Sequence, residues 1–393
     1  MKIIILVDHL PFSDNAAGGL QNYTLRIARS LYEKGEDVLV LCRAKVQAGL
    51  FDFPVRDYHV SFRRKTILKA LQAITFHLID NSLTILFDAW EVRRECHNFP
   101  NVDIIHSPNY KCLGLFVNHR KMKLIVRASS FHPIWTAEVQ NTLDNRMVSC
   151  LEKRLYKRAD HVFAPSRHLA GILENKLCRN VDVLPTLIPD KDQAESPKWY
   201  NENLLGRKYI LYFGTILKRK GLFILAEAMN KVWKENPNVL LVLAGPDLVV
   251  DGKSNYHRFL EIIGTNHDNV IYASNLSQEA LIPLIRNSFF TVSPSIEDNC
   301  PNSMLEAMAL GKIVLGTIGS SMEEFYPPSC QDLLVQRGDF QALAEKIIWL
   351  WDLSPQDISF YEQESKHFVE KNHSLDVAVN SLINYYRRVL AKN

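Results

Sequence analysis

Residues 293–311, SPSIEDNCPNSMLEAMALG, hold side chains and backbone groups suited to a ligand that carries phosphate. A buried strand is expected to end at Pro294, and a helix is expected to start near Asn302, a favourable N-cap residue. The backbone N–H groups of Asn302, Ser303 and Met304 would then lie at the positive end of a helix, where anions bind.

Carboxylates flank the same predicted helix end. Asp298 and Glu306 are separated by seven residues, and Glu297 directly precedes Asp298. Carboxylates accept hydrogen bonds from ribose and hexose hydroxyls. With the amides taking phosphate, the pattern indicates a sugar-nucleotide site, although a capped surface helix with ordinary acids explains it equally well.

A second segment, Phe213–Gly221 (FGTILKRKG), places a basic loop between a predicted strand and a predicted helix. The strand ends at Gly214. Arg219 and Lys220 could clamp a diphosphate leaving group and stabilise its charge as a bond breaks. The alternative is a solvated basic loop.

A third segment has paired glycines, Gly18 and Gly19, after the first predicted strand. Glycines at the start of a helix let the backbone approach a phosphate closely. The G-x-G-x-x-G fingerprint of dinucleotide-binding dehydrogenases is absent here, which argues against that class. A flexible loop is the alternative.

Alternating strands and helices position these segments. The order strand, loop, helix, strand at 3–42 is one crossover unit of a doubly wound sheet. The sequence becomes polar and contains prolines before residue 206, and the alternation of predicted strands and helices then restarts. We therefore expect two Rossmann-like α/β domains facing a cleft (1–188 and 206–373), joined by a linker (189–205) and followed by a final amphipathic helix (374–393).

Composition excludes several other classes. The chain has 393 residues, of which 47% are hydrophobic and 23% are charged, as in a globular protein. No apolar run is long enough for a transmembrane helix, and the opening MKIIILVD is too short for a signal peptide. The seven cysteines form no C-x-x-C pair, so neither a zinc cage nor a secreted disulfide framework is indicated, and a cytoplasmic location is expected.

The segment Leu305–Gly311 (LEAMALG), preceded by Pro301-Asn302-Ser303, resembles the donor-binding signature of retaining GT-B glycosyltransferases of family 4. The resemblance extends from Met1 to about residue 390 and is strong in the second half. It implies the GT-B fold, in which the N-terminal domain binds the acceptor, the C-terminal domain binds the nucleotide sugar and the final helix packs back on the first domain. It also implies retention of anomeric configuration, with no bound metal and no cofactor beyond a UDP- or GDP-linked sugar donor. In the family a glutamate occupies the first-carboxylate position, where this chain has Asp298, with Glu297 one residue earlier.

The resemblance also implies roles for the basic loop and for the base-binding turn. Lys220 matches the family's lysine, whereas Thr215 stands where the family has an arginine, so Arg219 would supply that charge. The turn Ser274, Asn275 and Leu276 resembles the one that holds the nucleotide base, with Ser274 in place of the usual glycine.

In the first domain, His106 closes a predicted strand at a place where the family often has a His or Glu lining the cleft. A packed structural histidine explains the residue about as well. Ser129 stands where relatives often have a further histidine, and Arg127 is the nearby polar candidate.

The expected activity is transfer of a sugar from a nucleotide donor to a hydroxyl of a glycan or glycolipid, in synthesis of a bacterial surface polysaccharide such as capsule or lipopolysaccharide. Alternatives are an epimerase or a phosphorylase on the same fold, although no segment suggests the phosphorylase's cofactor lysine. A non-catalytic partner subunit is a third, kept open by Thr215 and Ser129.

Charge is unequal between the two halves. Residues 1–190 contain 26 Lys+Arg and 19 Asp+Glu, whereas 191–393 contain 20 and 24. The basic half contains the clusters Arg63-Arg64-Lys65 and Arg120-Lys121. Peripheral attachment to the anionic inner face of a membrane explains this positive charge, and so does an ordinary scatter of basic surface residues. Nucleic-acid binding is disfavoured because no recognition motif accompanies the charge.

Overall fold

The computed structural model describes residues 1–10, 19–43, 49–58, 62–117, 122–133, 142–188, 198–250, 252–274 and 276–391. The described residues up to Leu187, together with those from Asp376 onward, form one compact unit. Those from Ile188 to Leu375 form the second compact unit.

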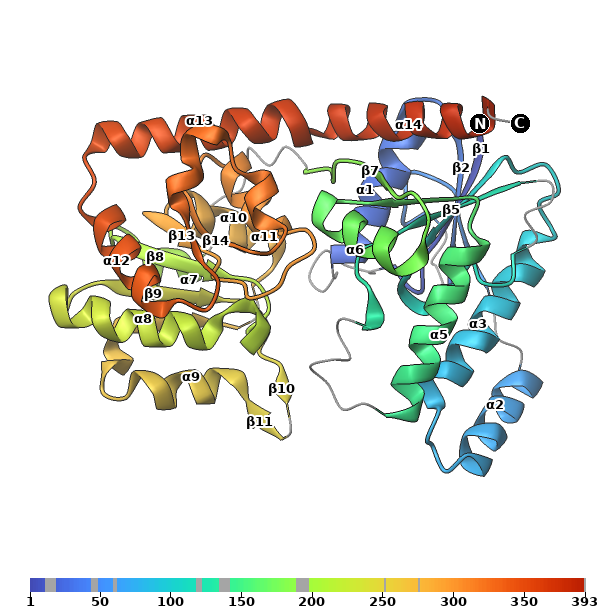
Figure 1. The fold of residues 1–393 in the computed structure, drawn as a ribbon, viewed down its shortest axis with the longest axis horizontal. Coiled ribbons are helices and arrows are strands. Elements are labelled where there is room, and N and C mark those ends of the chain that lie inside the picture. Colours follow the sequence, from blue (N-terminus) through green and yellow to red (C-terminus); the bar gives the residue numbers. More distant parts are fainter. Residues whose placement is uncertain are drawn as a thin grey trace. The chain divides into compact units, whose positions relative to one another are not determined.

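The first unit is built on a seven-stranded parallel sheet with the order β3-β2-β1-β4-β5-β6-β7 (Figure 1). Its central strands are apolar and buried on both faces, as parallel sheets covered by helices require. The strands are β1 (Lys2–Leu6), β2 (Asp37–Cys42), β3 (Val55–Asp57), β4 (Ile104–Pro108), β5 (Lys123–Arg127), β6 (His161–Ala164) and β7 (Asp182–Val183).

Helices cover this sheet, and one short 3-10 turn follows β4. They are α1 (Gly19–Glu33), α2 (Phe62–Ile74), α3 (Asp80–Cys96), η1 (Tyr110–Cys112), α5 (Leu143–Arg158), α6 (Arg167–Leu177) and α14 (Leu375–Ala391). Helix α5 starts at Leu143, with the Thr142 hydroxyl accepting from the Asn145 N–H. Helices α2 and α3 form a hairpin.

The second unit has a six-stranded parallel sheet with the order β12-β9-β8-β13-β14-β15. Its strands are β8 (Tyr209–Phe213), β9 (Leu240–Ala244), β12 (Val270–Ala273), β13 (Phe290–Val292), β14 (Val314–Ile318) and β15 (Leu334–Gln336), and a small antiparallel pair joins β10 (Val249–Val250) to β11 (Lys253–Ser254). Two parallel sheets with covering helices confirm the expected α/β architecture.

The remaining helices surround this second sheet (Figure 1). They are α7 (Lys198–Asn203), η2 (Lys218–Lys220), α8 (Leu222–Glu235), α9 (Asn255–Ile263), η3 (Asn266–Asn269), α10 (Gln278–Arg286), α11 (Asn302–Ala309), η4 (Met322–Phe325), η5 (Pro328–Leu333), α12 (Phe340–Trp351) and α13 (Pro355–His373).

The end of the expected linker is ordered structure. Within 189–205, α7 forms at Lys198–Asn203, and Tyr200 and Leu204 are buried in the core of the second unit. Residues 189–197 lie outside the described part of the chain. The polar composition of 189–205 gave no indication that Tyr200 and Leu204 are buried in a core.

The last helix packs on the first unit. Asp376 pairs with Lys34 at 2.8 Å, and Arg388 pairs with Asp182 at 3.0 Å. Tyr386 is fully buried between these ion pairs. Thus α14 completes the core of the first unit rather than ending as a free tail.

None of the helices in the described residues is long and apolar enough to cross a lipid bilayer. All seven cysteines are free thiols.

Candidate donor site and a second pocket

The two loops singled out in the second half of the sequence meet at one edge of the second sheet. Strands β8 and β13 are parallel neighbours, with Thr291 opposite Leu211. Because the carboxyl ends of parallel strands face the same way, the loops after β8 and β13 leave the sheet side by side. This is where open α/β sheets bind ligands.

The loop after β8 needs its glycines. Gly221 has φ +77°, and a Cβ there would lie 1.8 Å from the carbonyl oxygen of Pro294. At the start of the loop, the carbonyl oxygen of Gly214 lies 2.1 Å from where a Cβ of Gly245 would be. Only glycine at 221 allows the basic loop to pack this closely on the β13 loop.

Backbone and side-chain bonds hold the β13 loop in place. The Ile296 N–H donates to the Arg219 carbonyl at 2.9 Å, which links the two loops directly. The Thr317 hydroxyl donates to the Ser295 carbonyl at 2.6 Å, and the Ser321 N–H donates to the Asp298 carbonyl at 3.3 Å. The loop is therefore preorganised by β14 and the turn after it.

An ion pair joins the two loops at their functional positions. The Lys220 ammonium lies 2.5 Å from an Asp298 carboxylate oxygen, although 78 residues separate them. Asp298 is 7% exposed, and its other oxygen accepts from the Asn299 N–H at 3.0 Å. Burial raises the pKa of Tyr212, as does the Asp298 charge, while Arg219 opposes that rise, so both charges lie near this phenol.

Helix α11 begins differently from the expectation. Its N-cap residue is Pro301, without a side-chain cap, and Asn302 is already the first helical residue. The Asn302 N–H donates to the Cys300 carbonyl at 2.9 Å. Within the described residues, the N–H groups of Ser303 and Met304 have no acceptor, so two donors remain for an anion. The prediction of Asn302 as the cap was wrong because the proline ends the extended loop one residue earlier.

The other two carboxylates differ from Asp298. Glu306 is half-buried, one turn into α11. Glu297 is half-buried too and has no ion-pair or hydrogen-bond partner among the described residues. Asp298 is therefore the acid tied to the basic loop, and Glu297 is the adjacent acid left open to a ligand.

The expected base-binding turn follows β12. Ser274 is exposed and Leu276 is half-buried against the core of the second unit, whereas Asn275 lies outside the described residues. In the first unit, Gly19 is the exposed first residue of α1, and Gly18 lies outside the described residues. The structure therefore describes only one glycine of the predicted pair.

His106 is a core residue. It is 2% exposed, its Nδ1 lies 2.5 Å from the Tyr386 hydroxyl, and Phe163 meets its ring edge-on. Burial lowers its pKa to about 3, assisted by the nearby Arg127 charge. The structure therefore fits the alternative of a packed structural histidine, because Tyr386 of α14 covers the ring and the ring packs in the core.

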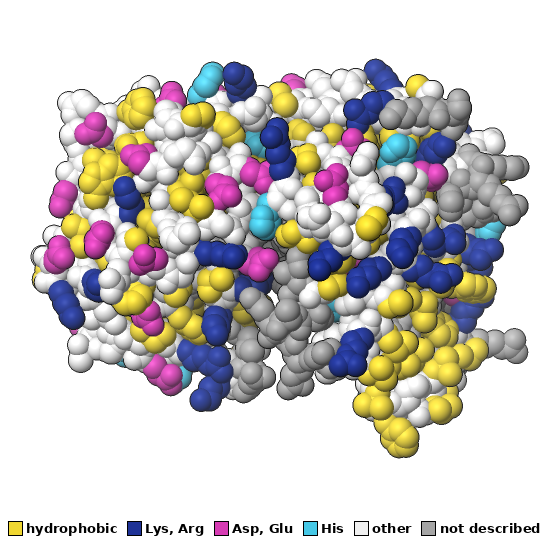
Figure 2. Space-filling model, in the orientation of Figure 1, with side chains coloured by type: hydrophobic (Ala, Val, Ile, Leu, Met, Phe, Trp, Pro, Cys, Tyr) yellow, Lys and Arg dark blue, Asp and Glu magenta, His cyan; other side chains and the backbone are white. Residues whose placement is uncertain are grey.

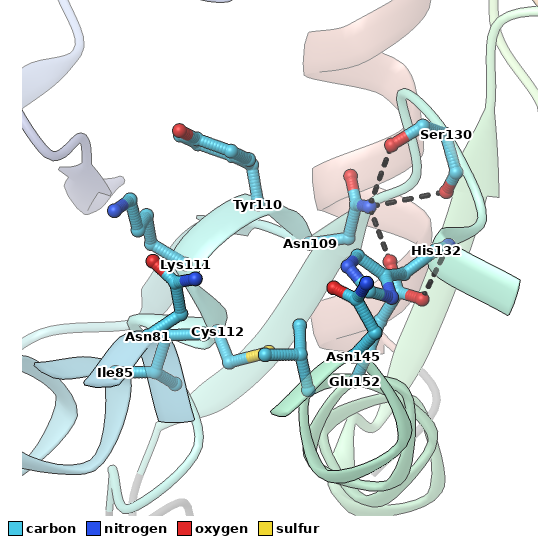
Figure 3. Close-up of a pocket in the computed structure, with 11 residues that line it drawn as sticks. Asn81, Ile85, Asn109, Tyr110, Lys111, Cys112, Ser130, His132, Asn145 and Glu152 are labelled. Atoms are coloured by element: carbon cyan, nitrogen blue, oxygen red, sulfur yellow. Dashed lines mark hydrogen bonds between the residues drawn. The ribbon is translucent and has the colours of Figure 1, made fainter. Parts of the chain in front are cut away.

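A pocket that the sequence did not indicate lies in the first unit and has both polar and apolar side chains in its lining (Figure 3). It has a cavity volume of about 380 Å³, with α3, η1, α5 and the loop after β5 around it. Asn109 is central: its amide donates to the Glu152 carboxylate at 2.6 Å and to the Ser130 carbonyl at 3.0 Å. The His132 N–H donates to the other Glu152 oxygen at 2.8 Å.

Glu152 is the most unusual group in this pocket. It is 3% exposed, and burial raises its pKa to about 7 against the opposing effect of hydrogen bonds from Asn109 and His132. A sequence signal existed, since Glu152 lies three and four residues before the buried Leu155 and Tyr156 on α5. An acid on the apolar face of a basic helix marks such a site.

Metal ligands are not grouped in this structure. In the described ranges, no three His, Cys, Asp or Glu side chains converge as a metal site would require.

Two sequence families match adjoining parts of the chain. The family described as "Glycosyl transferases group 1" matches residues 195–367, and "Glycosyltransferase Family 4" matches residues 17–191. No curated protein matches the chain.

Solved glycosyltransferase structures share the fold over the whole chain. Sucrose-phosphate synthase from Thermosynechococcus elongatus has a TM-score of 0.75 at 16% identity, with 100% of both chains covered. HepE from Anabaena, solved in complex with UDP-glucose, has a TM-score of 0.75 at 16% identity, covering 99% of this chain and 100% of its own. A glycosyltransferase from Rickettsia africae has a TM-score of 0.72 at 16% identity, covering 100% and 99%.

The two sheets and the two family matches define the class of the protein. The chain belongs to the GT-B glycosyltransferases of the family 4 type.

Proposed function

We propose that this glycosyltransferase uses a nucleotide-sugar donor, UDP- or GDP-linked, and retains anomeric configuration without a metal ion. The observation that carries the proposal is the Lys220–Asp298 pair beside the open amides of Ser303 and Met304. Cation, amides and carboxylates at one sheet edge match the diphosphate and hydroxyl groups of such a donor. HepE of the same fold, solved with UDP-glucose, supports this choice.

The side chains divide the work by charge. Lys220, Arg219 and the α11 amides stabilise the diphosphate as negative charge develops on it, which replaces the role of a divalent ion. Glu306 and Glu297 accept hydrogen bonds from donor hydroxyls, and Asp298 orients Lys220 until the diphosphate competes for it. The chemistry is then mainly positioning and charge stabilisation.

The acceptor belongs in the pocket of the first unit. Asn81, His132 and Asn145 place polar side chains in its lining, and the cavity of about 380 Å³ suits one sugar unit. A glycan or lipid-linked acceptor, as in surface-polysaccharide synthesis, fits this lining. The basic charge of the first half favours work at the anionic inner face of a membrane, with the protein on its cytoplasmic side.

Ligand-induced stabilisation tests the donor assignment. Melting temperatures with a panel of UDP-, GDP- and TDP-sugars should rise for one nucleotide class. Calorimetry with that donor should show at least tenfold weaker binding to Glu306→Ala, and unchanged binding to Glu345→Ala, whose side chain is exposed on α12. Unchanged affinity of Glu306→Ala would remove Glu306 from the site.

The donor panel and a measurement of nucleotide release separate the alternatives. A non-catalytic partner subunit would show no stabilisation by any donor. An epimerase would slowly release free nucleotide from the donor alone, whereas a glycosyltransferase needs an acceptor for rapid release.

A further inference from the structure

An exposed apolar surface lies at the turn of the α2–α3 hairpin. Phe76 is 84% exposed, Ile74 is 71% exposed and Leu78 is 60% exposed. Ile67 on α2 and Leu143 at the start of α5 are exposed as well. Figure 2 shows hydrophobic side chains gathered over this end of the first unit, at the lower right of the view. Here these five residues are called the hairpin tip.

The backbone holds Phe76 outward at an energetic cost. Phe76 has φ +50° and His77 has φ +60°, a left-handed conformation that helix ends usually assign to glycine. The His77 N–H donates to the Gln72 carbonyl at 2.8 Å, which closes the end of α2. A bulky apolar residue in this conformation is strained, and its side chain is exposed to water, so folding of the unit does not explain its presence.

Charge is sorted by sign around the tip. Residues 62–79 contain four Lys or Arg and no Asp or Glu. On α3 and α5 the acids Asp88, Glu91, Asp144 and Glu152 are buried, Glu95 is partly buried, and the partly exposed Asp80 beside the tip pairs with His77 at 2.8 Å. The basic side chains that are exposed on these three helices are Lys65, Lys69, Arg93, Arg94, Arg146, Lys153, Arg154 and Lys157. The exposed charges of these three helices are therefore mostly basic, and Figure 2 shows a row of Lys and Arg side chains bordering the hydrophobic area.

The tip adjoins the pocket of the first unit. The buried Asp144 carboxylate accepts from the Asn81 and Ser82 N–H groups at 3.0 and 2.9 Å, which fixes the start of α5 against α3. Asn81 and Asn145 line the pocket, and Leu143 lies two residues before Asn145. A molecule anchored at the tip would therefore present its polar end near Asn81 and Asn145, which line the pocket.

We propose that the hairpin tip docks on an anionic phospholipid bilayer and that the acceptor taken by the neighbouring pocket is lipid-linked. Apolar side chains enter the acyl boundary by about 5–10 Å in such contacts. Lys69 precedes Ile74 by five residues, or about 7.5 Å along the helix, so its ammonium can reach lipid phosphates when Phe76 and Leu78 enter the acyl boundary. This inference deepens the proposed membrane association and rests on it, but not on the donor chemistry.

Vesicle binding tests the surface directly. We expect the parent protein to cosediment with vesicles of phosphatidylglycerol and phosphatidylcholine, and to bind pure phosphatidylcholine at least tenfold more weakly. Phe76→Ser/Leu78→Ser should lower binding to the anionic vesicles at least tenfold. Phe360→Ser, which removes an exposed phenylalanine from α13, should not. Lys65→Glu/Lys69→Glu should weaken binding in the same way, whereas Lys234→Glu/Lys371→Glu in the second unit should not.

A depth measurement and a folding control complete the test. In Phe76→Trp, brominated lipids should quench fluorescence more strongly than in the parent. All variants should retain the parent's melting temperature shift with the nucleotide donor, because the tip lies outside the second unit.

Three results would overturn the proposal. Absence of parent binding to anionic vesicles would remove the membrane association itself. Equal vesicle binding by parent and Phe76→Ser/Leu78→Ser would show that the hairpin tip is not the membrane contact. A dimer in lipid-free solution that Phe76→Ser/Leu78→Ser abolishes, without vesicle binding by the parent, would assign the tip to a second copy of the chain. Failure of donor binding with intact vesicle binding would count against the proposed donor site alone.

Discussion

Lys220 and Asp298 form an ion pair across two loops that the sequence separates by 78 residues. The pair closes the gap between the end of β8 and the start of α11, and Gly221 next to Lys220 lets the loops touch. Since the Asp298 side chain is 8% exposed and the Lys220 side chain is 26% exposed, each partner limits the other's access to water. The pair therefore has a structural role as well as the proposed role toward the donor.

Substitution of Lys220 should separate these two roles. Lys220→Ala should lower kcat about 10²–10³-fold, because leaving-group charge loses its cation, and should lower the free energy of unfolding by about 1–3 kcal/mol, because a buried carboxylate loses its partner. Lys220→Ala/Asp298→Ala should regain stability without regaining kcat. Lys218→Ala, in the same turn, is the matched control for kinetics and denaturation. A double variant as active as the parent would contradict the role of Lys220.

Gly221→Ala should destabilise the second unit by more than its backbone conformation alone explains. The new Cβ would lie 1.8 Å from the Pro294 carbonyl oxygen, so the loops must separate. Gly206→Ala is a close control, because Gly206 has φ +76° against +77° for Gly221 and a Cβ added there would have no atom within 4 Å. We expect Gly206→Ala to cost about 1 kcal/mol and Gly221→Ala to cost clearly more, with weaker donor binding. Equal losses in melting temperature would mean that the close approach is unimportant.

His106 should make the protein less stable in acid. Its folded pKa of about 3 lies below the unfolded value of 6.5, so the unfolded chain binds a proton that the folded chain refuses. The contribution is fully present above pH 6.5 and is lost as the pH falls toward 3, by about 2 kcal/mol at pH 5. His106→Leu/Tyr386→Phe removes both partners and should flatten this part of the stability profile, whereas His257→Gln, at an exposed position, should not.

The same variants address the role of His106. Because the ring is packed under α14, the folded His106→Leu/Tyr386→Phe protein should retain kcat within about threefold. A loss of kcat by orders of magnitude at unchanged melting temperature would restore a catalytic role.

Glu152 should make the protein less stable as the pH rises, which is opposite to the effect of His106. Its folded pKa of about 7 lies above its ordinary value of 4.5, so the folded chain keeps a proton that the unfolded chain releases. The contribution is fully present below pH 4.5 and is lost as the pH rises through 7, by about 3 kcal/mol. Chemical denaturation between pH 4.5 and 8 should show that Glu152→Gln removes this slope, while Glu261→Gln, exposed on α9, leaves it. An unchanged slope in Glu152→Gln would mean that another group titrates.

Local patterns in the sequence predicted the alternation of strands and helices and the proposed donor-site segment. Residues 293–311 carry their function locally, because a strand end, a loop and a helix start are joined by a few peptide bonds. The identity of Glu306 and of the α11 amides as candidates followed from that connectivity. The alternation of buried strands with helices likewise follows from local apolar periodicity, which is why the α/β architecture was predictable.

Only the tertiary structure decided which distant residues meet. Tyr386 covers His106 across 280 residues, and this contact turned a predicted site residue into a core residue. Asn109, His132 and Glu152 lie in three segments that are distant in the sequence. They come together around one pocket only when β4, β5 and α5 pack against each other. The physical reason is that burial and pKa depend on all neighbours in space, whereas sequence spacing reports only neighbours along one element.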